Sequence, residues 1–136
     1  TQSRSSAASD VYKRQPYSRG MTDPTTLNAA ACRTAAKGTR TVRSRKHNYF
    51  FNPMWEILGS RTADQQPGSF YKRYDNSAIF WHLYDQVLLR PELVDRMVPD
   101  SPWVMTTAGT LGLVKPRGAI DSQFSDHLPI AISLEI

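Results

Sequence analysis

The sequence has little cysteine and no long run of apolar residues. Its single cysteine, Cys32, excludes an intramolecular disulfide and offers no second thiol for a metal site. No apolar run approaches the roughly 18 residues needed to span a bilayer, and the first residues lack the apolar stretch of a signal peptide. We therefore expect a cytoplasmic protein without a membrane span.

Acidic residues are missing from one stretch, although the chain of 136 residues has a net charge of only +5. Residues 47–136 carry seven basic and ten acidic side chains. Residues 33–46 carry no acidic side chain and six basic ones, namely Arg33, Lys37, Arg40, Arg43, Arg45 and Lys46. Such a cluster attracts polyanions, so one hypothesis is a non-enzymatic module that binds nucleic acid through residues 33–46. The other interpretation is a solvated loop, because no aromatic residue within the run could stack on bases.

Large aromatic residues are scarce in the first third of the chain. The three tryptophans and four of the five phenylalanines lie beyond position 50, so the core is expected in the last two thirds. Residues 1–15 are polar and have no periodicity that could bury a face. They also resemble translated adapter or vector DNA, and we predict a non-native or disordered leader over 1–15. The folded part is expected to be a single domain over 16–136.

The order of turn residues and apolar runs predicts an alternation of short helices and strands. Asp23 is a good N-cap, Pro24 suits a first helical position and Gly38 is placed as a stop, so a helix is expected over 24–37. The run that follows, up to Lys46, is expected to be a loop. The further expectations are an aromatic segment over 48–59, a hairpin of 68–74 with 78–90 turning at 75–77, a helix over 91–98, a strand over 103–107, a long loop over 109–125 and a terminal strand over 129–136.

Two places carry the residues most suited to chemistry. Asp126 and His127 lie between the long loop and the terminal strand, where the strand fixes the backbone and the loop exposes side chains. Taken alone, such a pair is also common turn chemistry. Asp85 shares a strand face with apolar residues, and a buried carboxylate there requires a partner. His127 is the expected partner, and the alternative is a structural Asp85 bonded to loop amides.

Ser125-Asp126-His127-Leu128-Pro129-Ile130, followed by an alternating strand, resembles the closing motif of the endonuclease/exonuclease/phosphatase superfamily. A second segment, Trp81 to Pro91, resembles the superfamily strand whose Asp orients the closing His, about forty residues upstream. A looser resemblance covers Pro16-Tyr17 and 48–55. The resemblance implies an α+β fold, a DNase I-like two-sheet β-sandwich flanked by helices, of which 16–136 is the C-terminal half. It also implies hydrolysis of a phosphoester, with nucleic acid, a lipid headgroup or a small phosphate ester as possible substrates.

The resemblance assigns roles to individual residues. His127, held by Asp85, would donate to a phosphate oxygen, and Asp126 would be a ligand for Mg²⁺ or Mn²⁺. Lys115 and Arg117 in the long loop are candidate phosphate contacts. The Gly-Asp-x-Asn motif of the superfamily, which supplies the water-activating base, is absent from the sequence, and so is the metal-binding Glu of the N-terminal half, so we predict a catalytically inactive chain. The oligomeric state stays open.

The remaining polar and aromatic candidates have structural interpretations beside functional ones. His82 is expected to be a packed or surface histidine on the face opposite Asp85, and His47 a solvated loop residue. Tyr49, Asn52 and Trp55 could line a substrate groove, but such an aromatic cluster more often closes the edge of a core.

Overall fold

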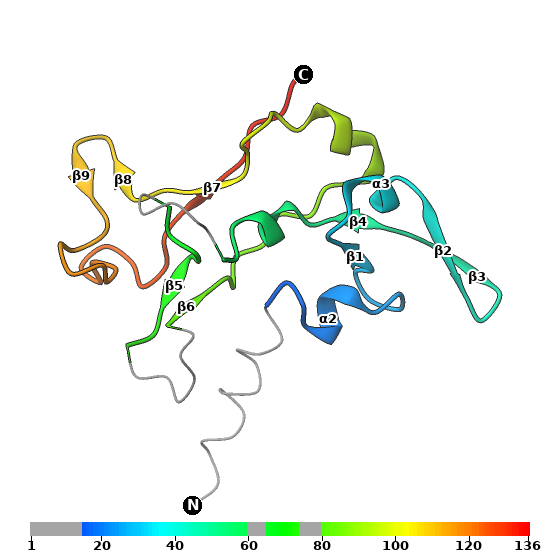
Figure 1. Cartoon of the computed structure of the whole chain (residues 1–136), viewed down its shortest axis with the longest axis horizontal. Coiled ribbons are helices and arrows are strands. Elements are labelled where there is room, and N and C mark those ends of the chain that lie inside the picture. The colour runs from blue at the N-terminus through cyan, green and yellow to red at the C-terminus, as the bar shows by residue number, and fades with distance from the viewer. Residues whose placement is uncertain (1–14, 60–64, 74–79) are drawn as a thin grey trace, which may run out of the picture.

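The computed structural model describes residues 15–59, 65–73 and 80–136. In these ranges the protein is a mixed α+β structure of short helices and five two-stranded sheets (Figure 1). The expected α+β class is confirmed, whereas two sheets packed as a sandwich are not seen in this part of the chain. In chain order the elements are α2 (Arg19–Thr22), β1 (Ala29–Ala30), α3 (Arg33–Ala36), β2 (Thr39–Val42), β3 (Arg45–Asn48), β4 (Phe50–Phe51), the 3₁₀ helix η1 (Pro53–Glu56), β5 (Phe70–Tyr71), β6 (Trp81–His82), the 3₁₀ helix η2 (Pro91–Arg96), β7 (Trp103–Val104), β8 (Thr107–Ala108), β9 (Leu111–Gly112) and β10 (Ile130–Ala131).

The last segment of the chain connects two of the small sheets. β10 pairs antiparallel with β7. Just before it, His127 lies opposite Phe70 in an antiparallel bridge, and the Leu128 N–H donates to the Ser69 carbonyl at 2.7 Å. β5 in turn pairs antiparallel with β6. Successive residues of an extended strand direct their backbone groups to alternate sides, so the segment 127–131 bonds to β5 on one side and to β7 on the other.

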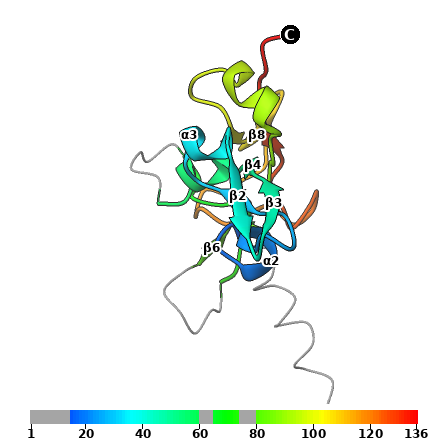
Figure 2. The same cartoon turned by 90° about the vertical axis from the view of Figure 1, so that its right-hand side faces the viewer.

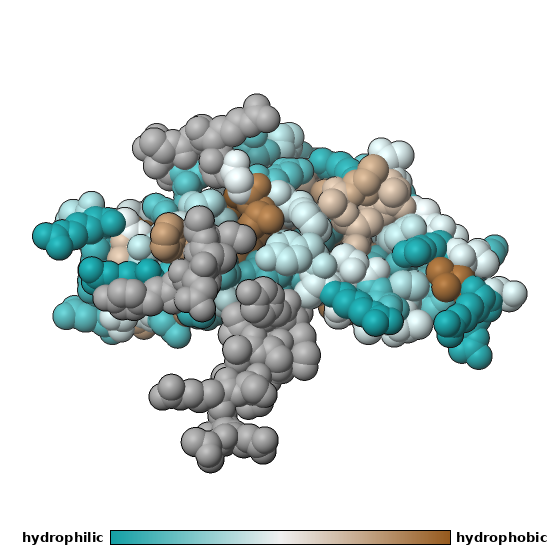
Figure 3. All heavy atoms as spheres, turned by 60° about the horizontal axis from the view of Figure 1, so that its bottom comes forward, coloured by the Kyte–Doolittle hydropathy of each residue, from teal (hydrophilic) through white to brown (hydrophobic). Residues whose placement is uncertain are grey.

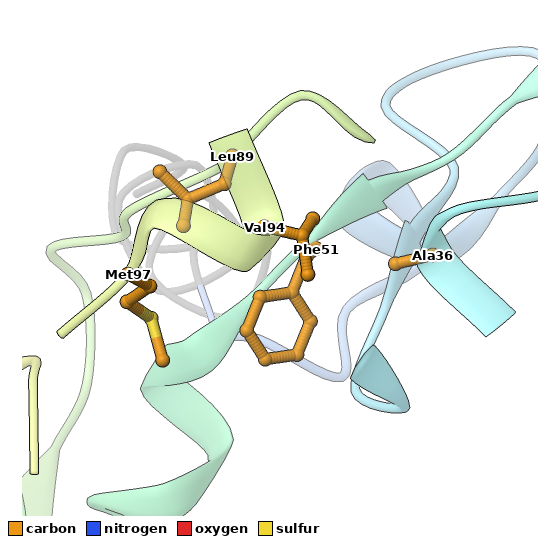
Figure 4. Close-up of a cluster of buried hydrophobic side chains, with 5 residues drawn as sticks. All are labelled: Ala36, Phe51, Leu89, Val94 and Met97. Carbon is orange, nitrogen blue, oxygen red and sulfur yellow. The ribbon is translucent and has the colours of Figure 1, made fainter. Parts of the chain in front are cut away.

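A buried apolar cluster lies where β4, α3 and η2 meet (Figure 4). The Phe51 side chain is buried in this cluster. The Phe51 backbone exchanges two hydrogen bonds with Leu89, and β4, which contains Phe51, pairs in parallel with β1. Burying one such phenylalanine contributes roughly 1.5–3 kcal/mol. The buried members of the cluster are Ala36, Phe51, Leu89, Val94 and Met97.

A second buried cluster positions the segment that carries Asp85, which lies in a bend after β6 and not in the strand expected over 78–90. Met54, Ile57 and Leu83 form the cluster, and Val104 of β7 packs against them. Leu83 is fully buried and the next residue, Tyr84, is 8% exposed. Both faces of this segment are therefore covered, as its apolar residues predict.

The expected helix over 24–37 is wrong. Asp23 Oδ1 accepts hydrogen bonds from the N–H and the hydroxyl of Thr25, at 2.8 and 2.6 Å. The Asp23 carbonyl accepts from the N–H of Asn28, whose φ is 46°. Short polar side chains that bond to nearby backbone favour turns over helix, and the chain then pairs as β1. Within 24–37 only α3 is helical. It ends at Ala36, and the N–H of Gly38, the expected stop, donates to the Ala35 carbonyl just beyond it.

The expected loop in the basic run is also wrong, because most of the run folds as the antiparallel hairpin β2–β3 (Figure 2). Val42 pairs with Arg45 across a two-residue turn. The turn residues Arg43 and Ser44 have φ values of 50° and 62°. Two left-handed residues make a type I′ turn, whose twist matches that of the strands. Asn and Gly suit this turn better, since other residues crowd their own backbone at positive φ.

We expect Ser44→Gly to stabilise the protein by about 1 kcal/mol, because glycine adopts positive φ without a Cβ clash. Ser44 is exposed, so few contacts are lost. The midpoint of urea unfolding measures the effect. Thr41→Gly in β2 is the control and should lower the midpoint, and a lower midpoint for Ser44→Gly would contradict the assignment of strain to this turn.

The other expected elements are present but shorter than predicted. β5 and β6 pair as the expected hairpin, and its turn over 75–77 lies outside the described residues. η2 falls within the helix expected over 91–98, and β7 and β10 fall within their expected strands. The long loop expected over 109–125 contains β9 and a bridge between Val114 and Ile120, so it folds back on itself.

Only Gln15 of the predicted leader 1–15 is among the described residues. Its side-chain amide donates to His82 Nδ1 at 3.0 Å, and its Oε1 accepts from the Leu83 N–H at 3.3 Å. Gln15 therefore belongs to the folded part. None of the helices in the described ranges has the length and apolar character that crossing a bilayer requires.

Candidate active site

The predicted contact between Asp85 and His127 is present. His127 Nδ1 lies 2.7 Å from Asp85 Oδ2, although the two residues are 42 positions apart in the sequence. The side chain of His127 is 32% exposed and that of Asp85 is 37% exposed, so the pair is accessible from solvent. Within the described residues the Asp85 carboxylate is bonded to the Ser69 hydroxyl and to His127, and not to the loop amides of the alternative interpretation.

The backbone on each side explains why these two side chains meet. Asp85 follows Leu83 and Tyr84, which are anchored in the interior. The Leu128 N–H is bonded to Ser69, and the His127 N–H donates to Ser125 Oγ at 3.0 Å. The imidazole ring also lies against Phe70, with ring centroids 5.0 Å apart. Strand pairing and ring packing thus fix both partners before any ligand binds.

Ser69 is a member of the site that the sequence analysis missed. Its hydroxyl donates to Asp85 Oδ2 at 2.5 Å, the same oxygen that contacts His127. Ser69 is fully buried, and its N–H donates to the His82 carbonyl at 3.0 Å. The available signal was a serine in an otherwise aromatic strand that was expected to pair with the strand of Asp85. A second hydrogen bond on one carboxylate oxygen restricts the carboxylate's rotation.

The chemistry of the contact sets the proton position on the imidazole. An ionised carboxylate only accepts hydrogen bonds, so Nδ1 must carry the proton in the contact with Asp85. Nε2 is then the ring nitrogen that is left to interact with a ligand. A carboxylate–imidazole pair of this kind holds the ring in one tautomer and one orientation.

A cleft of about 370 Å³ lies beside the pair. Asp121 lines it and is a second carboxylate that the sequence analysis missed. Lys115 Nζ lies 3.5 Å from Asp121 Oδ1, so this predicted phosphate contact lies next to the cleft. Arg117 is exposed and does not line the cleft. The lining residues are Asp85, Ala108, Leu113, Ile120, Asp121, Phe124, Ser125, His127, Leu128, Pro129 and Ile130.

Asp126, the predicted metal ligand, is exposed and follows Ser125 in the turn before His127. Across residues 15–59, 65–73 and 80–136, no three His, Cys, Asp or Glu side chains come close enough to hold a metal ion. The described donors therefore do not complete a site for Mg²⁺ or Mn²⁺. The role of Asp126 as a ligand stays a prediction.

His82 and Asn52 have structural partners other than Asp85 and His127. The His82 ring stacks on Tyr84 at 5.1 Å, which agrees with a packed histidine. Asn52 is buried, and its Oδ1 accepts from the Met54 N–H at 3.0 Å as the cap of η1. The Asn52 amide also donates to Gln86 Oε1 at 2.9 Å. This favours the core-edge interpretation of the aromatic segment over a substrate groove.

A scan against protein-family models, a search of curated proteins and a search of solved structures each found no match.

Proposed function

We propose that this chain carries the His–Asp part of a metal-dependent phosphoester hydrolase site of the endonuclease/exonuclease/phosphatase kind. The observation that supports the proposal best is the 2.7 Å contact between His127 Nδ1 and Asp85 Oδ2 at the edge of a cleft. The motif that resembles the superfamily's closing sequence thus lies where its histidine has an orienting carboxylate. The proposal includes the two-sheet sandwich as the architecture of the complete domain.

The proposed role of His127 is to donate a hydrogen bond from Nε2 to a non-bridging oxygen of the phosphoester, which requires the doubly protonated ring with one proton on each nitrogen. Negative charge grows on these oxygens in the transition state, and a donor fixed in advance stabilises that charge without reorganisation. Asp85 is a positioning residue, because it holds the ring through Nδ1. Ser69 positions Asp85 in the same way. Lys115 is paired with Asp121 at the edge of the cleft, so its proposed contact with phosphate would require the lysine to exchange this carboxylate for the phosphate.

Asp126 would contribute one carboxylate to a Mg²⁺ or Mn²⁺ site. The described residues do not complete that site, so the proposal for this chain rests on His127 and Asp85.

The proposal is tested by titrating the chain with dimethyl phosphate and following the imidazole resonances by NMR. We expect the His127 resonances to shift with saturation, because Nε2 donates to the added phosphate. Asp85→Asn should weaken this shift, and Asp121→Asn is the matched control from the same cleft. The His82 ring is the internal reference. A His127 ring that does not respond, or that responds equally in Asp85→Asn, would contradict the proposal.

We expect the chain by itself to show no turnover of bis(p-nitrophenyl) phosphate with Mg²⁺. The base that would activate water corresponds to a Gly-Asp-x-Asn motif that the sequence does not contain. The rate should equal that of His127→Ala. A wild-type rate above this control would show that another residue of the chain acts as the base.

A further inference from the structure

A second cleft lies between the basic hairpin β2–β3 and the turn that follows α2. Its volume is about 630 Å³. Figure 1 shows that β2 and β3, which carry part of this lining, lie at the opposite end of the molecule from β8 and β9. Figure 3 shows strongly hydrophilic side chains at that end. The lining residues are Arg19, Asp23, Pro24, Thr25, Val42, Arg43, Arg45 and His47.

The register of the hairpin explains which basic residues face this cleft. Residues directly opposite each other in an antiparallel pair lie on the same face, and faces alternate along each strand. Arg45 is opposite Val42, and His47 is opposite Arg40. These residues share one face, whereas Lys46 lies on the other. Arg43 extends from the turn at the end of the same cleft.

Some basic residues of the run over 33–46 are in hydrogen bonds or ion pairs within the protein, and others are not. Arg33 donates to the Val94 carbonyl at 2.6 Å, and Lys37 is paired with Asp95. Arg43 and Arg45 are exposed, and neither has an ion-pair partner within the part of the chain that the structure describes. The cleft therefore has two arginines whose charge is uncompensated.

One carboxylate, Asp23, lines the cleft, but its charge is already engaged. Hydrogen bonds from the side chain and the N–H of Thr25, and the neighbouring Arg19, lower the pKa of Asp23 to about 2. Asp23 Oδ2 lies 3.3 Å from Arg19 Nε. The carboxylate is ionised at neutral pH, and Arg19 offsets it. Arg43 and Arg45 then set the sign of the field in the cleft.

The turn gives a second reason to connect this place with binding. Arg43 holds a φ of 50°, a conformation in which Asn or Gly would be more stable. Unfavourable backbone conformations concentrate at functional sites. Here the strained position carries one of the two uncompensated cations.

We propose that this cleft binds the phosphodiester backbone of a nucleic acid. Arginine is suited to the bidentate recognition of phosphate, and a polymer with regularly spaced phosphates can reach both Arg43 and Arg45. No phenylalanine, tyrosine or tryptophan lines the cleft, and the two arginines are suited to phosphate, so we expect a contact to the backbone that is independent of base sequence. It has one apolar side chain apart from a proline, Val42, so it lacks the apolar face that inserts into a membrane.

This inference does not depend on the proposed hydrolase function, because neither Asp85 nor His127 lines the cleft. The test is the fluorescence anisotropy of a labelled duplex DNA, titrated with the full chain at several salt concentrations. We expect the double variant Arg43→Gln/Arg45→Gln to reduce the slope of log K against log[salt] by about 2, one for each lost phosphate contact. Arg43→Lys/Arg45→Lys should retain most of the slope, which separates loss of charge from misfolding.

The matched control is Arg90→Gln/Arg96→Gln, which removes the same charge from exposed arginines outside the cleft. It should leave the slope nearly unchanged, and His127→Ala should leave the binding constant unchanged. Ser44→Gly should bind as the wild type does. Any of three results would overturn the proposal. The first is an equal reduction of the slope in the two arginine-to-glutamine double variants. The others are no binding of the duplex by the wild type, and binding to anionic lipid vesicles in preference to the duplex.

Discussion

Gly68→Ala is expected to destabilise the protein by about 3 kcal/mol, at the upper end of the effects of overpacking. A Cβ on Gly68 would lie 2.5 Å from the carbonyl oxygen of His82 and 2.9 Å from its carbon. These are backbone atoms of the paired strand, so no side-chain rotation relieves the clash. β5 would have to separate from β6. Urea unfolding followed by tryptophan fluorescence measures the loss.

Gly112→Ala is the control for this change. The nearest heavy atom to a Cβ at Gly112 is 3.9 Å away, which is ordinary contact, and its effect should stay within about 0.5 kcal/mol. The expected pattern is a large loss at position 68 and almost none at position 112. Similar unfolding midpoints for the two variants would show that β5 does not approach β6 this closely.

Asp85→Asn is expected to reduce the preference of His127 for the Nδ1–H tautomer by roughly tenfold. A hydrogen bond to a charged group contributes about 1–2 kcal/mol more than a neutral one, and 1.4 kcal/mol corresponds to a factor of ten. An asparagine amide can also present its N–H₂ to the ring and favour the other tautomer. Long-range ¹H–¹⁵N correlation spectra of the imidazole distinguish the two tautomers directly.

Asp121→Asn removes a carboxylate from the same cleft without removing a partner of His127. It should leave the tautomer ratio unchanged. Ser69→Ala should give an intermediate result, because the Asp85 carboxylate stays charged but loses one of its hydrogen bonds. An unchanged ratio in Asp85→Asn would show that the 2.7 Å contact does not determine the position of the proton.

The sequence predicts strand pairing better than helix in this protein. The alternation and the turn residues predicted the β5–β6 pair and the terminal strand, because these patterns reflect burial of one or two strand faces. The helix over 24–37 was wrong, because Asp23 and Thr25 bond locally and the alanines that follow pair with β4. Capping residues alone do not distinguish a helix start from such a turn.

The candidate site was predictable in part. The contact between Asp85 and His127 was predicted from a buried strand carboxylate that requires a partner and from the resemblance; the contact is present, although Asp85 is 37% exposed and lies in a bend after β6. Ser69 was missed although a serine in an otherwise aromatic strand was a signal. Asp121 was missed because its place depends on how the loop over 113–121 folds back, and nothing local in the sequence specifies that. The hairpin β2–β3 was missed because Arg43-Ser44 is not a usual type I′ turn sequence.

The sharing of Asp85 Oδ2 by Ser69 and His127 has a consequence for the order in which the chain assembles. Ser69 and Asp85 are 16 residues apart, whereas Asp85 and His127 are 42 apart. Closing the longer loop costs about 0.8 kcal/mol more in chain entropy. During synthesis the serine–carboxylate pair can also form before His127 emerges. The histidine thus docks onto a carboxylate that is already oriented, and residues 127–131 hold it there by pairing with β5 and β7.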